Sequence, residues 1–72
     1  MQEIVEVPIT GKMLNIKVGI GDKVKEGEVI CLLESMKMEN PILVPVSGVI
    51  KEIRVSAGQT VKTGDIITII EY

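Results

Sequence analysis

Residues 34–40 read ESMKMEN, and the amine of Lys37 is the side-chain group in the chain best placed to do chemistry. Lys37 lies between Met36 and Met38, and a lysine amine can form a covalent bond to a carried group. The remaining sequence has no His, a single Cys and one aromatic residue, Tyr72. Without His, no Cys–His or Ser–His nucleophile pair can form, and the composition supplies no structural zinc site. We therefore expect no catalytic residue and no metal site.

The length and the charge of the chain limit the class of protein. Its 72 residues correspond to one small domain, residues 1–72, near the lower limit for a self-sustaining core. The net charge of −2 and the near absence of aromatic residues argue against nucleic-acid binding. The first residues lack the basic and apolar regions of a signal peptide, and no apolar stretch approaches the roughly 18 residues that span a membrane. We expect a cytoplasmic protein that does not insert into a membrane.

The sequence contains an internal duplication with a shift of 37 positions, which places residue 7 over residue 44. Residues 7–34 align without a gap over residues 44–71. The identical pairs include Pro8/Pro45, Gly11/Gly48, Val18/Val55, Gly21/Gly58, Val24/Val61, Gly27/Gly64 and Glu34/Glu71. Such a repeat indicates two copies of one supersecondary unit, each too small to bury a core alone. We expect a single body with approximate two-fold symmetry.

Each copy has the composition of β structure, because Val and Ile dominate and their branched side chains pack well on a pleated sheet. Gly, Pro, Asp and Ser separate short apolar runs. The runs cover residues 14–18, 29–33, 49–55 and 66–70. The shared glycines lie between runs, where a turn requires positive φ or close backbone approach. The pattern predicts an all-β sandwich or flattened barrel.

The segment 35–37 has no counterpart in the repeat and therefore links the two copies. A strand ending at Glu34 and a strand starting near Met38 leave room only for a tight hairpin with Met36 and Lys37 at its bend. By the pseudo-symmetry, the equivalent place is where the chain ends meet, so we expect Lys37 at the opposite pole. Neither bend residue is typical of a tight turn, and such departures often mark function. The alternative is a tolerated turn with both methionines packed on the core.

Three other residues have simpler interpretations. Cys31 lies in an apolar run and aligns with Thr68, so we expect a buried or half-buried small residue and not a reactive thiol. Met13 is expected to fill the core or to cover a strand surface. Pro41 follows the hairpin closely, and a proline there suits an edge strand or a bulge.

At residues 34–39 the sequence resembles the biotinyl attachment domain of biotin-dependent carboxylases and decarboxylases. That family carries Glu-Ala/Ser-Met-Lys-Met-Glu in a hairpin between two halves of a flattened barrel, and ESMKME matches throughout. The resemblance extends over essentially the whole chain, including Gly-Asp-x-Val-x-x-Gly at 21–27 and Ser-Gly at 47–48. It implies a barrel-sandwich hybrid of two four-stranded antiparallel sheets. Thr10 departs from a frequent second proline in the early turn.

The resemblance implies that a biotin protein ligase joins biotin to Lys37 as an amide. Met36 and Met38 correspond to flanking residues that help ligase selection or later turnover. Glu34 and Glu39 are candidates for recognition by partner enzymes, although Glu34 recurs as Glu71 and a purely structural or solvating role is equally open.

The implied function is that of a biotin carboxyl carrier. The domain would move a carboxyl group between a biotin carboxylase and a carboxyltransferase or decarboxylase, without catalysing either step. One alternative is a lipoyl carrier of an oxo-acid dehydrogenase or of glycine cleavage, although lipoyl domains usually have Asp before and Ala after the lysine. Another is an unmodified barrel of the kind found in membrane-fusion proteins of efflux pumps, which carry helical hairpins inserted at the bend.

Overall fold

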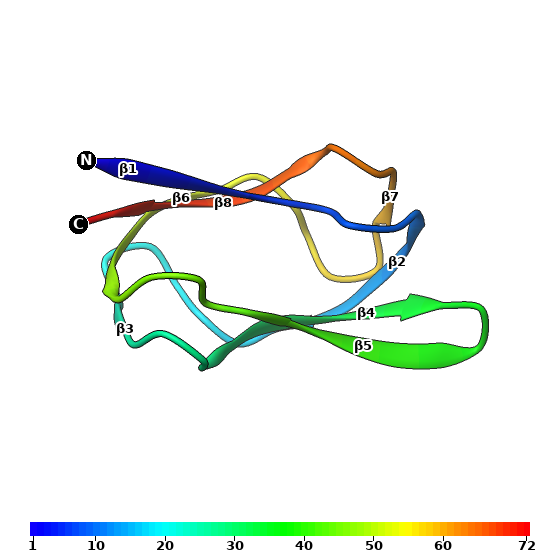
Figure 1. Cartoon of the computed structure of the whole chain (residues 1–72). Helices are drawn as coiled ribbons and strands as arrows, with labels where there is room; N and C mark the ends of the chain where they lie inside the picture. The colour runs from blue at the N-terminus through cyan, green and yellow to red at the C-terminus, as the bar shows by residue number, and fades with distance from the viewer.

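The computed structural model describes all 72 residues, which form eight β-strands and no helix (Figure 1). The strands are β1 (Gln2–Glu6), β2 (Gly11–Ile16), β3 (Lys23–Val24), β4 (Val29–Ser35), β5 (Met38–Leu43), β6 (Gly48–Ile53), β7 (Thr60–Val61) and β8 (Ile66–Glu71).

The strands pair into two four-stranded sheets, and every neighbouring pair is antiparallel. One sheet has the order β1-β8-β6-β3 and the other has the order β5-β4-β2-β7. Figure 1 shows the layer containing β1 and β8 lying over the layer containing β4 and β5. The predicted fold of two four-stranded antiparallel sheets is confirmed.

The sequence repeat appears in the structure as a pseudo-two-fold relation between the sheets. Adding 37 to the bounds of β2 gives those of β6, and the same shift relates β3 to β7. The two sheet orders exchange under this operation. Loop hydrogen bonds repeat as well: Lys25 N donates to Glu28 Oε1 at 3.0 Å, and Lys62 N donates to Asp65 Oδ2 at 2.8 Å. Two nearly equal halves therefore form one symmetric scaffold.

The core lies between the two sheets and consists of aliphatic, Met and Cys side chains. Strand alternation directs one face of each sheet inward, and burial of that face is the main stabilising term. The cluster contains Val5, Val7, Met13, Val24, Ile30, Cys31, Leu33, Ile42, Val44, Ile50, Val55, Val61, Ile67 and Ile70. Met13 is fully buried, so it takes the first of its two expected places.

Gly11 and Gly48 begin β2 and β6, which are equivalent under the repeat, and each lies against a backbone carbonyl. A Cβ added at Gly11 would lie 2.3 Å from the carbonyl oxygen of Glu34, and one added at Gly48 would lie 2.3 Å from that of Glu71. No other residue type fits this approach without a backbone shift. The shared glycines of the other turns have positive φ, as their placement between apolar runs predicts.

The apolar runs did not indicate the two shortest strands, β3 and β7. Each has only two residues, and each pairs with the first residues of a strand from the other half of the chain. Their strand character comes from this tertiary pairing, which local composition does not reveal.

Candidate functional site

The β4–β5 hairpin turns through two residues, Met36 and Lys37, between the paired residues Ser35 and Met38. Met36 has φ 54° and Lys37 has φ 62°, and no other non-glycine residue has positive φ. Two positive φ values are the requirement of a type I′ turn, whose twist matches that of the flanking strands. The predicted hairpin, with these two residues at the bend, is confirmed.

The side chains at the bend point into solvent. Met36 is 90% exposed and Met38 is 65% exposed. The interpretation that both methionines pack on the core is therefore wrong. Lys37 is also exposed, and it takes part in neither ion pair of the structure, which are Lys51–Glu71 and Arg54–Glu52. A primary amine is thus held at a defined place without a charged partner.

The two faces of the hairpin carry different chemistry. Glu34 and Glu39 pair across the hairpin, and Lys12 of β2 pairs with Glu34 on its other side. All three are exposed, so they form a charged row on the outer face of the sheet. Two like charges directly opposite each other are unfavourable in a sheet. Lys12 places an opposite charge beside this acidic pair.

The other face of the hairpin is an extension of the inner face of the sheet, past the last residue that packs in the core. Leu33 is buried, and strand alternation places Ser35 and Met38 on the same face. Ser35 Oγ donates a hydrogen bond to the carbonyl oxygen of Thr10 at 3.0 Å. The Thr10 hydroxyl in turn accepts one from the backbone N–H of Thr63 at 3.3 Å. The base of the hairpin is thus attached to two loops, and only the bend projects.

The hairpin edge is also shaped by β5, which is the outer strand of its sheet. Pro41 lies in this edge strand and removes one backbone donor, as the sequence predicts. Asn40 Nδ2 donates to the carbonyl oxygens of Met38 at 3.2 Å and Leu33 at 3.4 Å, which supports the strand close to the bend.

The chain ends lie at the opposite end of the molecule from the β4–β5 bend, which contains Lys37 (Figure 1). The protein measures 33 × 18 × 16 Å along its principal axes. The N-terminal amine of Met1 donates to Tyr72 O at 2.8 Å, and Tyr72 N donates to Met1 O at 2.9 Å. Under the shift of 37, this pair corresponds to Met38 and Ser35. The predicted opposition of the lysine and the chain ends is confirmed.

The structure brings all five predicted site residues, Glu34, Met36, Lys37, Met38 and Glu39, into this one hairpin. Their roles in attachment and recognition stay predictions. Sequence reasoning missed the supporting side chains, which are Thr10, Lys12, Ser35 and Asn40. A signal existed for one of them, because Thr10 aligns with Ser47, whose hydroxyl accepts the matching bond from Glu26 N at 3.0 Å.

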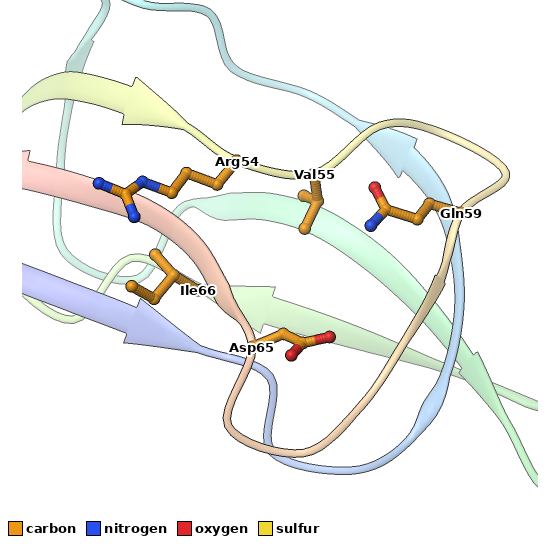
Figure 2. A pocket seen from close by; sticks show the side chains of 5 residues that line it. All are labelled: Arg54, Val55, Gln59, Asp65 and Ile66. Atoms are coloured by element: carbon orange, nitrogen blue, oxygen red, sulfur yellow. The ribbon is translucent and has the colours of Figure 1, made fainter.

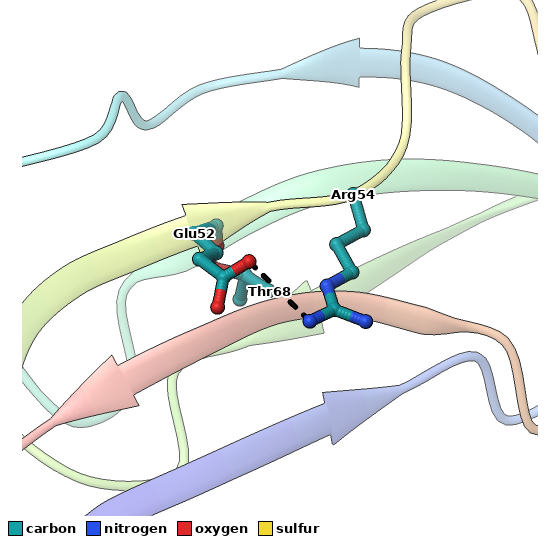
Figure 3. Close-up of polar contacts among 3 residues, drawn as sticks. All are labelled: Glu52, Arg54 and Thr68. Carbon is teal, nitrogen blue, oxygen red and sulfur yellow. Dashed lines mark hydrogen bonds and ion pairs between the residues drawn. The ribbon is translucent and has the colours of Figure 1, made fainter.

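Cys31 carries the only thiol of the chain, and the structure buries it completely. Burial away from water raises the pKa of its thiol from 9.0 to about 11, which disfavours the reactive thiolate. Its counterpart Thr68 is equally buried and donates a hydrogen bond to the backbone carbonyl oxygen of Glu52. The side-chain carboxylate of Glu52 forms an ion pair with Arg54 (Figure 3). The expectation of a buried, unreactive cysteine agrees with this environment.

A shallow hollow beside β8 does not offer a second site. Arg54, Val55, Gln59, Asp65 and Ile66 line it (Figure 2). Its polar groups already have partners: Asp65 accepts from Lys62 N, Gln59 accepts from Ser56 N at 3.0 Å, and Arg54 pairs with a glutamate at 3.3 Å. The two-residue bend at Met36 and Lys37 therefore remains the candidate site.

Comparison with known protein families supports the hairpin as the functional site. The family model described as "Biotin-requiring enzyme" matches residues 3–70, and the chain belongs to this family. It is a biotinyl attachment domain of the carboxyl carrier type. The exposed and unpaired amine of Lys37 fits the covalent attachment of biotin, the cofactor of the family.

The chain is similar to several biotin-enzyme proteins. It is 49% identical over 39 residues to glutaconyl-CoA decarboxylase subunit gamma of Acidaminococcus fermentans, covering 54% of this chain and 27% of that one. It is 46% identical over 43 residues to biotinylated protein TB7.3 of Mycobacterium tuberculosis, covering 60% and 61%. The crystal structure of Kluyveromyces lactis urea carboxylase matches with a TM-score of 0.91 and 27% identity, covering 99% of this chain and 6% of that one.

These similarities favour biotin over lipoate as the carried group. The chain spans less than two thirds of the length of each relative named above. The two-residue bend differs from the inserted helical hairpins of the efflux-pump barrels. No helix of sufficient length and apolarity to cross a membrane is present.

Proposed function

We propose that Lys37 Nζ is the attachment point of biotin and that the domain carries carboxyl groups between two active sites. The observation that supports this most strongly is the geometry of the bend. Lys37 is held on a rigid two-residue turn, exposed, without an ionic partner and at the far end from Met1 and Tyr72.

Attachment requires the formation of one amide bond. Lys37 Nζ attacks the activated carboxyl carbon of biotin, a proton leaves the nitrogen, and the activating group leaves with the electron pair of the broken bond. A biotin protein ligase would supply the activated acid. The amide removes one positive charge, so the formal net charge of the domain changes from −2 to −3.

The carrier role follows from tethering. When bound, biotin supplies the group that takes up and releases CO₂. The chain's own contribution is to present Lys37 Nζ beyond the body of the domain, which keeps the attached group at a local concentration on the order of millimolar near a partner. Support for the partners, a biotin carboxylase and a carboxyltransferase or decarboxylase, comes from similarity to a decarboxylase subunit and to urea carboxylase.

We further propose that the domain comprises residues 1–72 as one unit and is not itself a catalyst. The single pseudo-symmetric core supports the first statement, and the absence of His supports the second. Operation in the reducing cytoplasm is consistent with one buried, unpaired cysteine.

The proposal is tested by incubating the protein with a biotin protein ligase, ATP and biotin, followed by intact mass measurement and peptide mapping. We expect one biotin per chain, on the peptide that contains Lys37. A parallel reaction with a lipoate ligase and lipoate should leave the mass unchanged. Modification by lipoate alone, or biotin on a different lysine, would overturn the proposal.

A further inference from the structure

Two of the four methionines lie beside Lys37 and are open to solvent. Met36 is 90% exposed and Met38 is 65% exposed, whereas Met13 is 0% exposed. Large apolar side chains exposed together on a small protein usually mark a surface that contacts something else. The sulfur atoms that the bend presents are also the atoms that oxidants attack first.

The geometry leaves neither methionine a way to withdraw. The left-handed backbone of Met36 belongs to a closed two-residue turn, so its direction is fixed by the hairpin. Met38 extends the inner face of the sheet past the buried Leu33. At this position 65% of its surface remains exposed to solvent. Both thioethers therefore remain accessible in the folded state.

We infer that Met36 and Met38 form an oxidation-sensitive modification site that controls the use of Lys37. The inference rests on the proposed function of that lysine. The oxidant is a peroxide such as hydrogen peroxide. Each thioether sulfur attacks one peroxide oxygen, the O–O bond breaks, and a sulfoxide forms. The sulfur loses two electrons, and the second oxygen leaves as water after taking up the two peroxide protons.

The modification matters because of where the new oxygen is placed. An enzyme site that encloses Lys37 Nζ must also cover the adjacent side chain of Met36 and the neighbouring Met38. A thioether can be covered at little cost, whereas a sulfoxide oxygen that loses water without gaining a hydrogen bond opposes binding. We expect about a tenfold lower kcat/KM for ligase labelling of the oxidised protein, mainly through KM.

The chain contains its own matched controls. Met1 is 85% exposed and is the pseudo-symmetric counterpart of Met38, but it lies at the other end of the molecule. Met13 reports whether the core has opened during treatment. Oxidation of Met1 should therefore leave the labelling rate unchanged, and Met13 should remain unoxidised.

The experiment treats the full chain with graded hydrogen peroxide, removes the oxidant, and maps sulfoxides by mass spectrometry. The circular dichroism melting curve is recorded to confirm the fold. Initial rates of biotinylation by a biotin protein ligase are then measured before and after treatment, for the wild type and for the double variant Met36→Leu/Met38→Leu. Methionine sulfoxide reductases should restore the wild-type rate.

The expected result is a rate that falls about tenfold in the wild type, with sulfoxide at Met36 and Met38, and a treated-to-untreated ratio near one in the double variant. Unchanged labelling of the oxidised wild type, or an equal loss in the double variant, would overturn the inference alone. Failure of the untreated wild type to be labelled at Lys37 would overturn the proposed function and the inference together.

Discussion

The hairpin end and the terminal end of this protein are equivalent under the pseudo-two-fold relation, yet only the hairpin end has a two-residue bend that presents a lysine side chain. At one end Ser35 and Met38 flank the bend, and at the other their counterparts Tyr72 and Met1 hydrogen-bond to each other directly. The two ends share their strand pairing and their close glycine contacts. The difference is the pair of residues at the bend, which shows how little chain a carrier needs to add to a duplicated scaffold.

The comparison also separates side chains that serve the scaffold from those that serve the site. The loop bonds of Lys25 and Lys62 recur in both halves, so they belong to the scaffold. The bend residues Met36 and Lys37, with their positive φ values, have no counterpart in the rest of the scaffold. Local strain at such a place is tolerated because the surrounding sheet holds it.

The largest expected effect is the loss of labelling in Lys37→Arg. The variant keeps the charge and the exposure but replaces the amine by a guanidinium, which stays protonated and does not form the amide. Labelling by a biotin protein ligase, followed by streptavidin blot, should fall to background, and the thermal melt should not move. Lys62→Arg at the same end of the molecule is the control and should label normally. Labelling of Lys37→Arg at another lysine would contradict the assignment.

A second prediction compares the two glycines that touch carbonyl oxygens. Gly48→Ala should lower the free energy of unfolding by about 3 kcal/mol and Gly11→Ala by about 2 kcal/mol, as overpacking does. The larger effect arises because the new Cβ of Gly48→Ala also lies 2.8 Å from Ile70 Cγ2, against 3.3 Å from Leu33 Cδ1 at Gly11. Urea denaturation measures both values. Gly11→Ala alone should also slow labelling, because Gly11 contacts the hairpin at Glu34. A larger loss of stability in Gly11→Ala than in Gly48→Ala would show that the backbone around Gly48 adjusts to the added Cβ more easily than the backbone around Gly11.

A third prediction concerns the buried pair Cys31 and Thr68, in which a thiol in one half takes the place of a hydroxyl in the other. The thiol pKa is 9.0 without the fold and about 11 within it, so the unfolded chain loses the proton first as the pH rises. The free energy of unfolding should therefore be fully retained below pH 9 and fall between pH 9 and 11, by up to about 2–3 kcal/mol.

Cys31→Thr is the matched variant for this test, because Thr68 occupies the equivalent place. Other titrating groups cancel in the difference between the wild type and the variant, measured by urea denaturation at pH 8 and at pH 11. A difference that does not change between these two pH values would show that burial does not hold the thiol in its neutral form.

The smallest expected effect is a gain of stability from Met36→Asn. Asn tolerates the left-handed backbone better than Met, so the free energy of unfolding should rise by roughly 0.5–1 kcal/mol. Met38→Asn is the control, since Met38 has no positive φ and Asn is poor in a strand. The midpoints of chemical denaturation of the two variants should shift in opposite directions, upward for Met36→Asn and downward for Met38→Asn. A loss of stability in Met36→Asn would indicate that its side chain contributes contacts that outweigh the turn strain.

Much of the architecture could be predicted because the repeat constrains it. A gap-free shift of 37 positions requires two equal units, and the unmatched segment 35–37 must then connect them. The place of Lys37 opposite the chain ends follows from this argument and from no local propensity. The strands β3 and β7 could not be predicted in the same way, because two residues carry too little pattern and their pairing is set by the other half of the chain.

The site could be predicted less completely than the fold. Sequence left open whether Met36 and Met38 pack inward, because an apolar side chain next to a turn can point either way. The structure decides this through the register Ser35–Met38, which places the bend beyond the core. The Ser35–Thr10 bond joins positions 25 residues apart, and such a contact is visible only in three dimensions.

The hydrogen-bonded pair of Met1 and Tyr72 makes the backbone nearly a closed ring. A short peptide joining the two ends should be accommodated as easily as the existing bend, and the ring could then be reopened in an exposed loop to give a circular permutant with unchanged strand pairing. For the same reason, a host polypeptide interrupted by this domain would see its two flanking segments emerge side by side. Such a host would hold the domain through two adjacent linkers at one end, and the amine of Lys37 would be exposed at the opposite end.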